Sequence, residues 1–248
     1  MVSLWEALGK AKEYRWVDLT HELENDSPYW SGIPSGSVEL GKQVMDYAEM
    51  GFEIQTFKFP GQFGTHIDYP AHFVPGARRA AAFGLKETVL PLVVLDVSQK
   101  AASDRDYELT VQDVLEFEER YGRIPKGCFV ALRTDWSKGW PSMEKLCGLD
   151  GEGNEHFPAW GYEALRFLYE ERGIAANGHE TLDTDAPVSS SVRGLRCERY
   201  VLERDAFQVE AMCNLDQVPP VGAVIVVAAP RIACANGLPV RAFAVCPD

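Results

Sequence analysis

The sequence predicts an α/β fold with one mixed β-sheet in a single domain spanning residues 1–248. Two continuous apolar runs, residues 88–98 and 128–135, are typical of strands that are covered on both faces. Segments with helical character separate such runs, and no low-complexity linker or repeat interrupts the chain. The chain length alone is compatible with one large domain or two small ones, so the lack of a linker favours one.

The first part of the chain is expected to contain one helix and several strands. Residues 4–14 have the apolar spacing of an amphipathic helix, and residues 17–23 resemble a first strand. Two extended segments, 52–59 and 62–68, flank a Pro-Gly dipeptide that favours a turn. A β-hairpin formed by these two segments is therefore the simplest arrangement.

Two helices are expected in the middle of the chain. Thr110 is a suitable N-cap with Asp113 three residues later, so a helix is predicted from there to Gly122. A second helix is predicted over residues 160–173, where Gly173 is the stop signal. Further strand-like segments follow at residues 173–183, 206–212, 223–231 and 240–246.

Composition and charge exclude several classes of protein. The formal net charge is −13, so the average surface repels phosphate backbones and anionic membranes, and no nucleic acid partner is expected. No apolar run is long enough to span a bilayer, and the first residues lack a secretory signal, so a cytoplasmic protein with no membrane partner is predicted. The six scattered cysteines form no C-x-x-C pair and are expected to be reduced and mostly buried.

The stretch of residues 60–73, PGQFGTHIDYPAHF, contains two of the five histidines and carries the strongest functional signal. If residues 62–69 are extended, alternation places Gln62, His66 and Asp68 on one face and apolar side chains on the other. His66 and Asp68 can then converge on one ion, and Gln62 reaches it if the strand curls at Gly64. Nitrogen and oxygen ligands together suit Zn²⁺ or Mn²⁺.

Pro70 ends regular strand pairing and is expected to bring His72 over the metal. A metal lowers the pKa of bound water, and a histidine titrates in the same range, which is the chemistry of a hydrolase. The alternative is an ordinary strand and loop whose polar groups face water. For any single residue that structural interpretation is favoured, whereas the joint arrangement of Gly, Thr, Pro and two histidines favours a site.

Other polar and aromatic residues are weaker candidates. His179 lies in GHETLDTD, a dense polar group after a predicted strand, which either lines the site or forms a solvated loop. Trp30 and Phe73 are candidates to contact a flat substrate, although packing alone explains most of the aromatic residues of such segments.

The motif QFGTHIDYPAHF resembles the signature H-x-G-T-H-x-D-x-P-x-H of the cyclase-like metal hydrolases, which include kynurenine formamidases and isatin hydrolases. The resemblance extends to VDLTHEL near the start and to QVEAMCNLDQVPPVGAVIVVAAP near the end. It implies a swivelling β/β/α fold, a divalent metal, and hydrolysis of a linear or cyclic amide. Sites near subunit contacts in a homodimer or homotetramer are also implied, and the segment 136–158 is a candidate contact.

Matched position by position, the resemblance makes His66 and Asp68 metal ligands and His72 the catalytic acid/base. Glu210 matches a family glutamate that binds or bridges metal, and Glu198 falls where two-metal members have another histidine. Gln62 replaces the first histidine of the signature, so one ion, Mn²⁺ or Zn²⁺, is predicted instead of two.

The predicted function is hydrolysis of an isatin-like aromatic lactam. The alternatives are a kynurenine formamidase-type arylformamide hydrolase and a non-catalytic protein that binds a small ligand.

Overall fold

The computed structural model describes residues 3–30 and 32–247, and its largest element is a nine-stranded sheet in the order β1-β13-β11-β5-β7-β9-β10-β4-β12. Neighbouring strands at its centre are parallel: β5 (Val89–Asp96), β7 (Phe129–Arg133), β9 (Ala176–His179) and β10 (Phe207–Glu210). Antiparallel strands flank them: β11 (Ala223–Ala228), β13 (Arg241–Cys246) and β1 (Arg15–Asp18) on one side, β4 (His66–Asp68) and β12 (Gly237–Pro239) on the other. The predicted mixed α/β sheet is confirmed, whereas the swivelling β/β/α arrangement stays a prediction.

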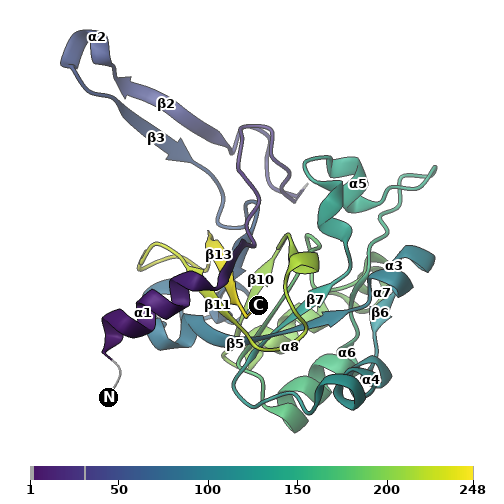
Figure 1. Ribbon diagram of the computed structural model, residues 1–248. Coiled ribbons are helices and arrows are strands. Elements are labelled where there is room, and N and C mark those ends of the chain that lie inside the picture. Colours follow the sequence, from purple (N-terminus) through teal and green to yellow (C-terminus); the bar gives the residue numbers. More distant parts are fainter. Residues whose placement is uncertain (1–2, 31, 248) are drawn as a thin grey trace.

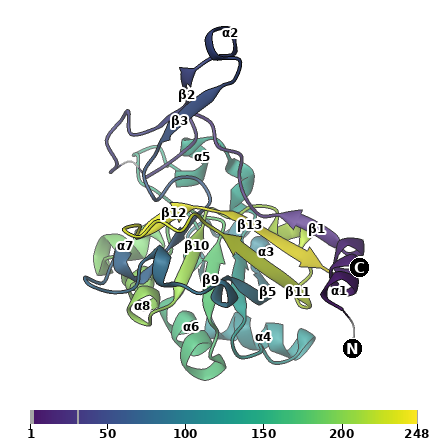
Figure 2. The ribbon, with the colours of Figure 1, turned by 90° about the vertical axis from the view of Figure 1, so that its left-hand side faces the viewer.

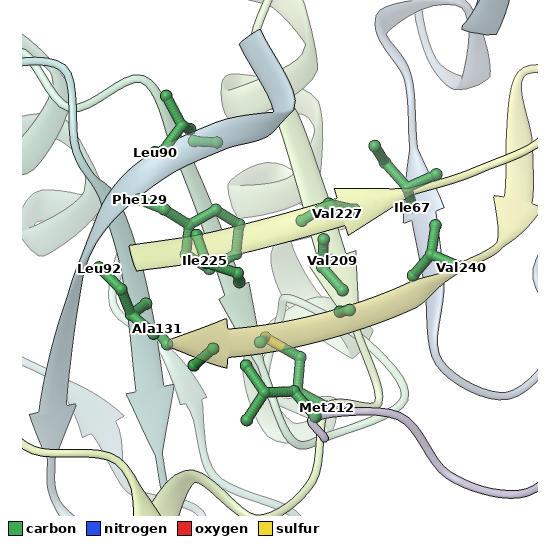
Figure 3. Close-up of a cluster of buried hydrophobic side chains, with 14 of the residues drawn as sticks. Ile67, Leu90, Leu92, Phe129, Ala131, Val209, Met212, Ile225, Val227 and Val240 are labelled. Atoms are coloured by element: carbon green, nitrogen blue, oxygen red, sulfur yellow. The ribbon is translucent and has the colours of Figure 1, made fainter. Parts of the chain in front are cut away.

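Alternating side chains of the central strands fill two separate cores. In β5, Leu92 belongs to the first core and Val93 to the second, and in β7 Phe129 and Val130 divide in the same way. The first core lies on the inner face of the curled sheet and includes Ile67 of β4 (Figure 3). The second core packs against helices on the other face. This explains why β5 and β7 read as continuous apolar runs in the sequence.

The helices that cover the second core are α4 (Val111–Tyr121), α6 (Tyr162–Phe167) and α8 (Arg196–Glu203), seen below the sheet in Figure 2. The capping box predicted at Thr110 and Asp113 is present, and α4 ends before Gly122 as expected. The helix predicted over 160–173 is divided, because α6 passes into a π-helical turn at Leu168–Arg172 before Gly173 ends it.

The other elements are short and lie around the sheet. Helix α1 (Leu4–Glu13) confirms the first predicted helix, although none of its residues is buried. The strand predicted over 17–23 is observed as β1, which begins earlier, at Arg15, and already ends at Asp18. The remaining elements are α3 (Ser98–Ser103), α5 (Met143–Cys147), α7 (Pro187–Arg193) and the paired strands β6 (Glu108–Leu109) and β8 (Ala159–Trp160).

The hairpin predicted around the Pro-Gly dipeptide is wrong. Strand β3 (Ile54–Lys58) pairs with β2 (Glu39–Met45) instead, and β4 enters the main sheet between β10 and β12. The β2–β3 hairpin, with α2 (Tyr47–Met50) at its tip, projects from the body of the molecule (Figure 1). The burial of the strands gives the physical reason: every residue of β3 is exposed and every residue of β4 is buried, so the two strands belong in different surroundings.

Two predictions from composition can be compared with the structure. Across residues 3–30 and 32–247, no helix is both long and apolar enough to cross a membrane. The cysteines are free thiols, and all are buried except Cys234, which is exposed. Burial of most cysteines is therefore confirmed, and the cytoplasmic location stays a prediction.

Candidate functional site

The structure brings His66, Asp68 and Glu210 together through the pairing of β4 with β10. In this antiparallel pair Glu210 stands opposite His66, and Gln208 stands opposite Asp68. Opposed residues on one face of such a pair lie close enough for their side chains to interact. His66 Nε2 is 3.4 Å from Asp68 Oδ2 and 3.5 Å from Glu210 Oε2, and all three side chains are buried. The three therefore form a group that could hold a metal ion.

Gly64 sets the orientation of the His66 ring. Its φ is +58°, and a Cβ at this position would lie 2.1 Å from Leu23 Cδ2, so a residue without a side chain is required. The Gly64 carbonyl lies 2.9 Å from His66 Nδ1. A carbonyl only accepts, so Nδ1 carries a proton, and in the neutral form of the ring Nε2 turns a lone pair toward the two carboxylates. This arrangement is suited to a cation.

The carboxylates of the site crowd one another in a buried region. Burial, with the charge of Asp68 added, raises the pKa of Glu210 and of Glu198 well above the usual range. For Asp68 burial acts in the same direction, but attraction to the protonated form of the His66 ring outweighs it and lowers the pKa. The same attraction outweighs burial at His66 and raises the pKa of that ring. Burial likewise raises the pKa of Asp183 to about 7. So many buried acids are costly to ionise without a counter-charge.

A second group of possible ligands shares Asp68 with the first and adds His72 and Glu198. His72 ends the short 3₁₀ helix Pro70–His72, and its Nε2 is 3.7 Å from Glu198 Oε1. Glu198 lies in the first turn of α8, which is held by Asp185 accepting hydrogen bonds from the Cys197 and Glu198 amides. The turn at Pro70 thus brings His72 back toward Asp68, as the sequence predicts.

Gln62 also reaches Asp68. Its Nε2 donates a hydrogen bond of 3.1 Å to Asp68 Oδ1. Gly237 of β12 makes room for this contact, since a Cβ there would lie 2.1 Å from Gln62 Nε2. The residue that departs from the signature is therefore next to a candidate ligand, with its amide nitrogen turned toward that ligand.

A cavity of about 440 Å³ opens onto these groups. Gln62, His66, His72 and Glu210 line it on the polar side. Glu155, Asp183, Ser190 and Glu198 also line it. Apolar and aromatic residues form most of the remaining wall, among them Pro28, Tyr29, Trp30, Ile33, Phe73, Leu182 and Leu195. The size and the mixture of an apolar wall with a few converging polar groups are typical of a small-molecule site.

The structure places two of the three residues predicted for substrate contact on this cavity. Trp30 and Phe73 line it, and Trp30 is 63% exposed. His179 is not among the lining residues: it lies behind Glu210, with its Nε2 3.4 Å from Glu210 Oε1 and only 1% of its surface exposed.

Sequence reasoning left several residues of the site without a role. Asp183 stood only as one member of a polar group, yet it lines the cavity. Glu198 had only an unsupported match to the family histidine, and the structure gives it a place beside His72. Thr184 and Gln208, which contact Glu210, carried no signal in the sequence.

Comparison with known proteins gives the family of this chain. A family model described as putative cyclase matches residues 17–186, which is more than half of the chain. The chain belongs to the putative cyclase family. The match covers the motif at residues 62–72 and stops before β10, so Glu198 and Glu210 lie outside the matched segment.

Isatin hydrolases are among the similar members of the cyclase family. The isatin hydrolase of Roseibium aggregatum is 30% identical over 189 residues, which cover 74% of this chain and 71% of that protein. The solved structure of isatin hydrolase A from Labrenzia aggregata, bound to benzyl benzoate, has a TM-score of 0.88 and 30% identity over 99% of this chain and all of that one. Similarity to a kynurenine formamidase of Bacillus anthracis is more limited: 31% identity over 99 residues, covering 35% of this chain and 41% of that protein.

Proposed function

We propose that this cyclase-family protein is a metal-dependent hydrolase that opens the amide bond of a small aromatic lactam of the isatin type. The observation that carries the proposal is the buried group of His66, Asp68 and Glu210 on a cavity with aromatic walls. Similarity to isatin hydrolases over most of the chain supports the reaction class.

The residues present fit a divalent cation. His66 Nε2 and Asp68 Oδ2 are buried and have no hydrogen-bond partner among the described residues. Buried polar atoms are normally paired, so two such atoms facing each other favour an ion between them. His66, Asp68 and Glu210 would hold Mn²⁺ or Zn²⁺, and Gln62 would add its amide oxygen after a rotation of the side chain.

We propose a single ion, with Mn²⁺ slightly favoured because most of these donors are oxygens. A second ion would need a second group of ligands, and Asp68, His72 and Glu198 form a group of the right size. A second ion bound there would prevent His72 from transferring protons. We therefore assign His72 to catalysis and not to metal binding.

The ion, when bound, would polarise the amide carbonyl and lower the pKa of a water molecule. The protein's own residues would do the rest. His72 would accept a proton from that water and deliver it to the departing nitrogen, with Glu198 at 3.7 Å orienting the ring. Trp30 and Phe73 would hold the flat substrate against the cavity wall.

The test is turnover of isatin by the metal-loaded protein, followed for parent and His72→Ala. We expect the parent to open isatin and the variant to lose about 100-fold or more of kcat while still binding metal. Full activity in His72→Ala would refute the acid/base assignment. The formamidase alternative predicts hydrolysis of N-formylkynurenine instead, and turnover of neither compound would leave only the reaction class.

A non-catalytic binding protein is the alternative of another class. It would use the same cation and cavity to hold a small carboxylate, and Gln62 in place of histidine leaves room for it. Such a protein has no need of His72. Tight binding of a small aromatic carboxylate, together with no hydrolysis of isatin or N-formylkynurenine, would favour this interpretation.

We also propose that the protein is a homodimer or homotetramer. The β2–β3 hairpin carries large apolar side chains that are exposed to solvent, including Val44, Tyr47, Met50, Phe52, Ile54 and Phe57. A two-stranded ribbon is only marginally stable alone, so a second copy of the chain is the fitting cover. Segment 136–158 exposes a single large apolar side chain, Leu149, so the hairpin is the stronger candidate for the contact. Light scattering that gave a monomer at micromolar concentration would refute the proposal.

A further inference from the structure

One buried histidine, His179, has no role in the proposed function. His179, at the end of β9, is 1% exposed, and the indole of Trp160 in β8, which it contacts, is fully buried. Neither residue lines the cavity. The pair therefore does not contact a substrate, and any contribution to the site passes through Glu210.

The contact between the two rings determines where His179 carries its proton. Trp160 Nε1 lies 3.1 Å from His179 Nδ1. An indole nitrogen only donates, so Nδ1 is the acceptor and has no proton. The ring proton is consequently on Nε2, and this N–H faces Glu210 Oε1 at 3.4 Å, a contact that is not a hydrogen bond, with no other hydrogen-bond partner for Nε2 among the described residues.

Glu210 presents two oxygens with different surroundings. Thr184 Oγ1 and Gln208 Nε2 each lie 2.9 Å from Oε1, the same oxygen that His179 faces. Oε2 instead faces His66 Nε2 at 3.5 Å. Two hydrogen-bond donors and the His179 N–H thus lie on the side of Oε1, and Oε2 is left as the oxygen directed at the proposed cation.

We propose that Trp160 and His179 are positioning residues that hold Glu210 with Oε2 directed at the cation, and so set the affinity of the site for metal. The proposal rests on the function proposed above. Substituting a residue that contacts a metal-bound side chain typically lowers metal affinity or activity by about 10- to 100-fold. The opposing interpretation is that the two rings only fill the core.

Trp160→Phe separates these interpretations, because it keeps an aromatic ring in the core and removes the indole N–H. We expect the dissociation constant for Mn²⁺, measured by calorimetric titration of chelator-treated protein, to rise about 10-fold or more. The matched control is Tyr169→Phe, which removes a partly buried 2.7 Å hydrogen bond to Asn177 of β9, the strand that carries His179, away from the cavity. It is expected to change the constant less than about twofold.

His179→Gln and His179→Leu provide a second comparison if Trp160→Phe does not fold. Glutamine can accept from Trp160 and donate to Glu210, whereas leucine can do neither. The glutamine variant is therefore expected to retain more Mn²⁺ affinity than the leucine variant. Equal affinities for the two would overturn the proposal.

The tautomer gives a readout that needs no metal and no activity. Nitrogen-15 NMR of the metal-free protein is expected to show His179 protonated at Nε2 and unprotonated at Nδ1. A proton on Nδ1 would overturn this inference and leave the proposed function standing. Unchanged Mn²⁺ affinity in Trp160→Phe would do the same. A parent protein that binds no divalent cation would overturn the proposed function, and the role in metal affinity with it.

Discussion

Asp183 offers a direct test of how much it costs to ionise a carboxyl group in the cavity. It lines the cavity with Glu198 and Glu210, and burial raises its pKa from 3.8 to about 7. In the folded protein this carboxyl keeps its proton up to about pH 7, whereas the unfolded chain releases it near 3.8. The folded state therefore binds more protons within this window, and the free energy of unfolding contributed by Asp183 falls as pH rises through it.

The size of the effect follows from the same shift. One pKa unit corresponds to about 1.4 kcal/mol, so the cost of Asp183 grows by up to about 3 kcal/mol between about pH 5 and pH 8. Asp183→Asn removes this cost and keeps an oxygen that accepts from the Asp185 amide, as Asp183 Oδ1 does at 2.9 Å. We expect the variant to gain stability over the parent progressively as pH rises.

Urea unfolding of chelator-treated parent and variant at several values from about pH 5 to pH 8 measures the difference. Glu163→Gln, which replaces an exposed carboxylate of α6, gives the baseline for loss of a surface charge. Stability differences between Asp183→Asn and the parent that stay constant across this range would refute the reasoning.

Other substitutions test the supports of the site and its selectivity. Gly178→Ala is expected to cost about 1–3 kcal/mol in thermal or urea unfolding, since a Cβ there would lie 2.6 Å from Met212 Sδ and 2.7 Å from Phe129; an unchanged midpoint would contradict this. Glu180→Gln replaces a buried carboxylate that accepts hydrogen bonds from the loop after β7, so the free energy of unfolding is expected to fall by about 1–3 kcal/mol in the same assay. A change near zero would mean that the loop does not depend on this carboxylate for its stability. Gln62→His is expected to shift metal preference toward zinc and to recruit a second ion; an unchanged metal profile would show that Gln62 does not face the cation.

The sequence was sufficient where the chemistry lies in a short stretch of chain. His66 and Asp68 share one strand, and His72 follows the turn at Pro70, so alternation and a proline predict their approach without knowledge of the fold. Glu210 is different, because its place opposite His66 depends on pairing between strands far apart in the chain. A resemblance to known proteins indicated this residue, and no local pattern does so.

The parts that could not be predicted depend on long-range contacts of the same kind. The chain only bends at Gly61, and the partner of β3 is β2, whose sequence ELGKQVM lacks the clear alternation of a strand packed on a core. Glu198 comes near His72 because Asp185 holds the start of α8. Neither relation is visible from residue types and spacing alone.

The central claim is that His66, Asp68 and Glu210 hold one catalytic divalent ion. Elemental analysis of protein purified without chelator, in parallel with isatin turnover, tests it most directly. We expect one equivalent of manganese or zinc per chain, lost together with activity when Asp68→Asn removes a charge from the site. Two equivalents of zinc would contradict the single-ion site, and full activity without any bound metal would contradict the mechanism.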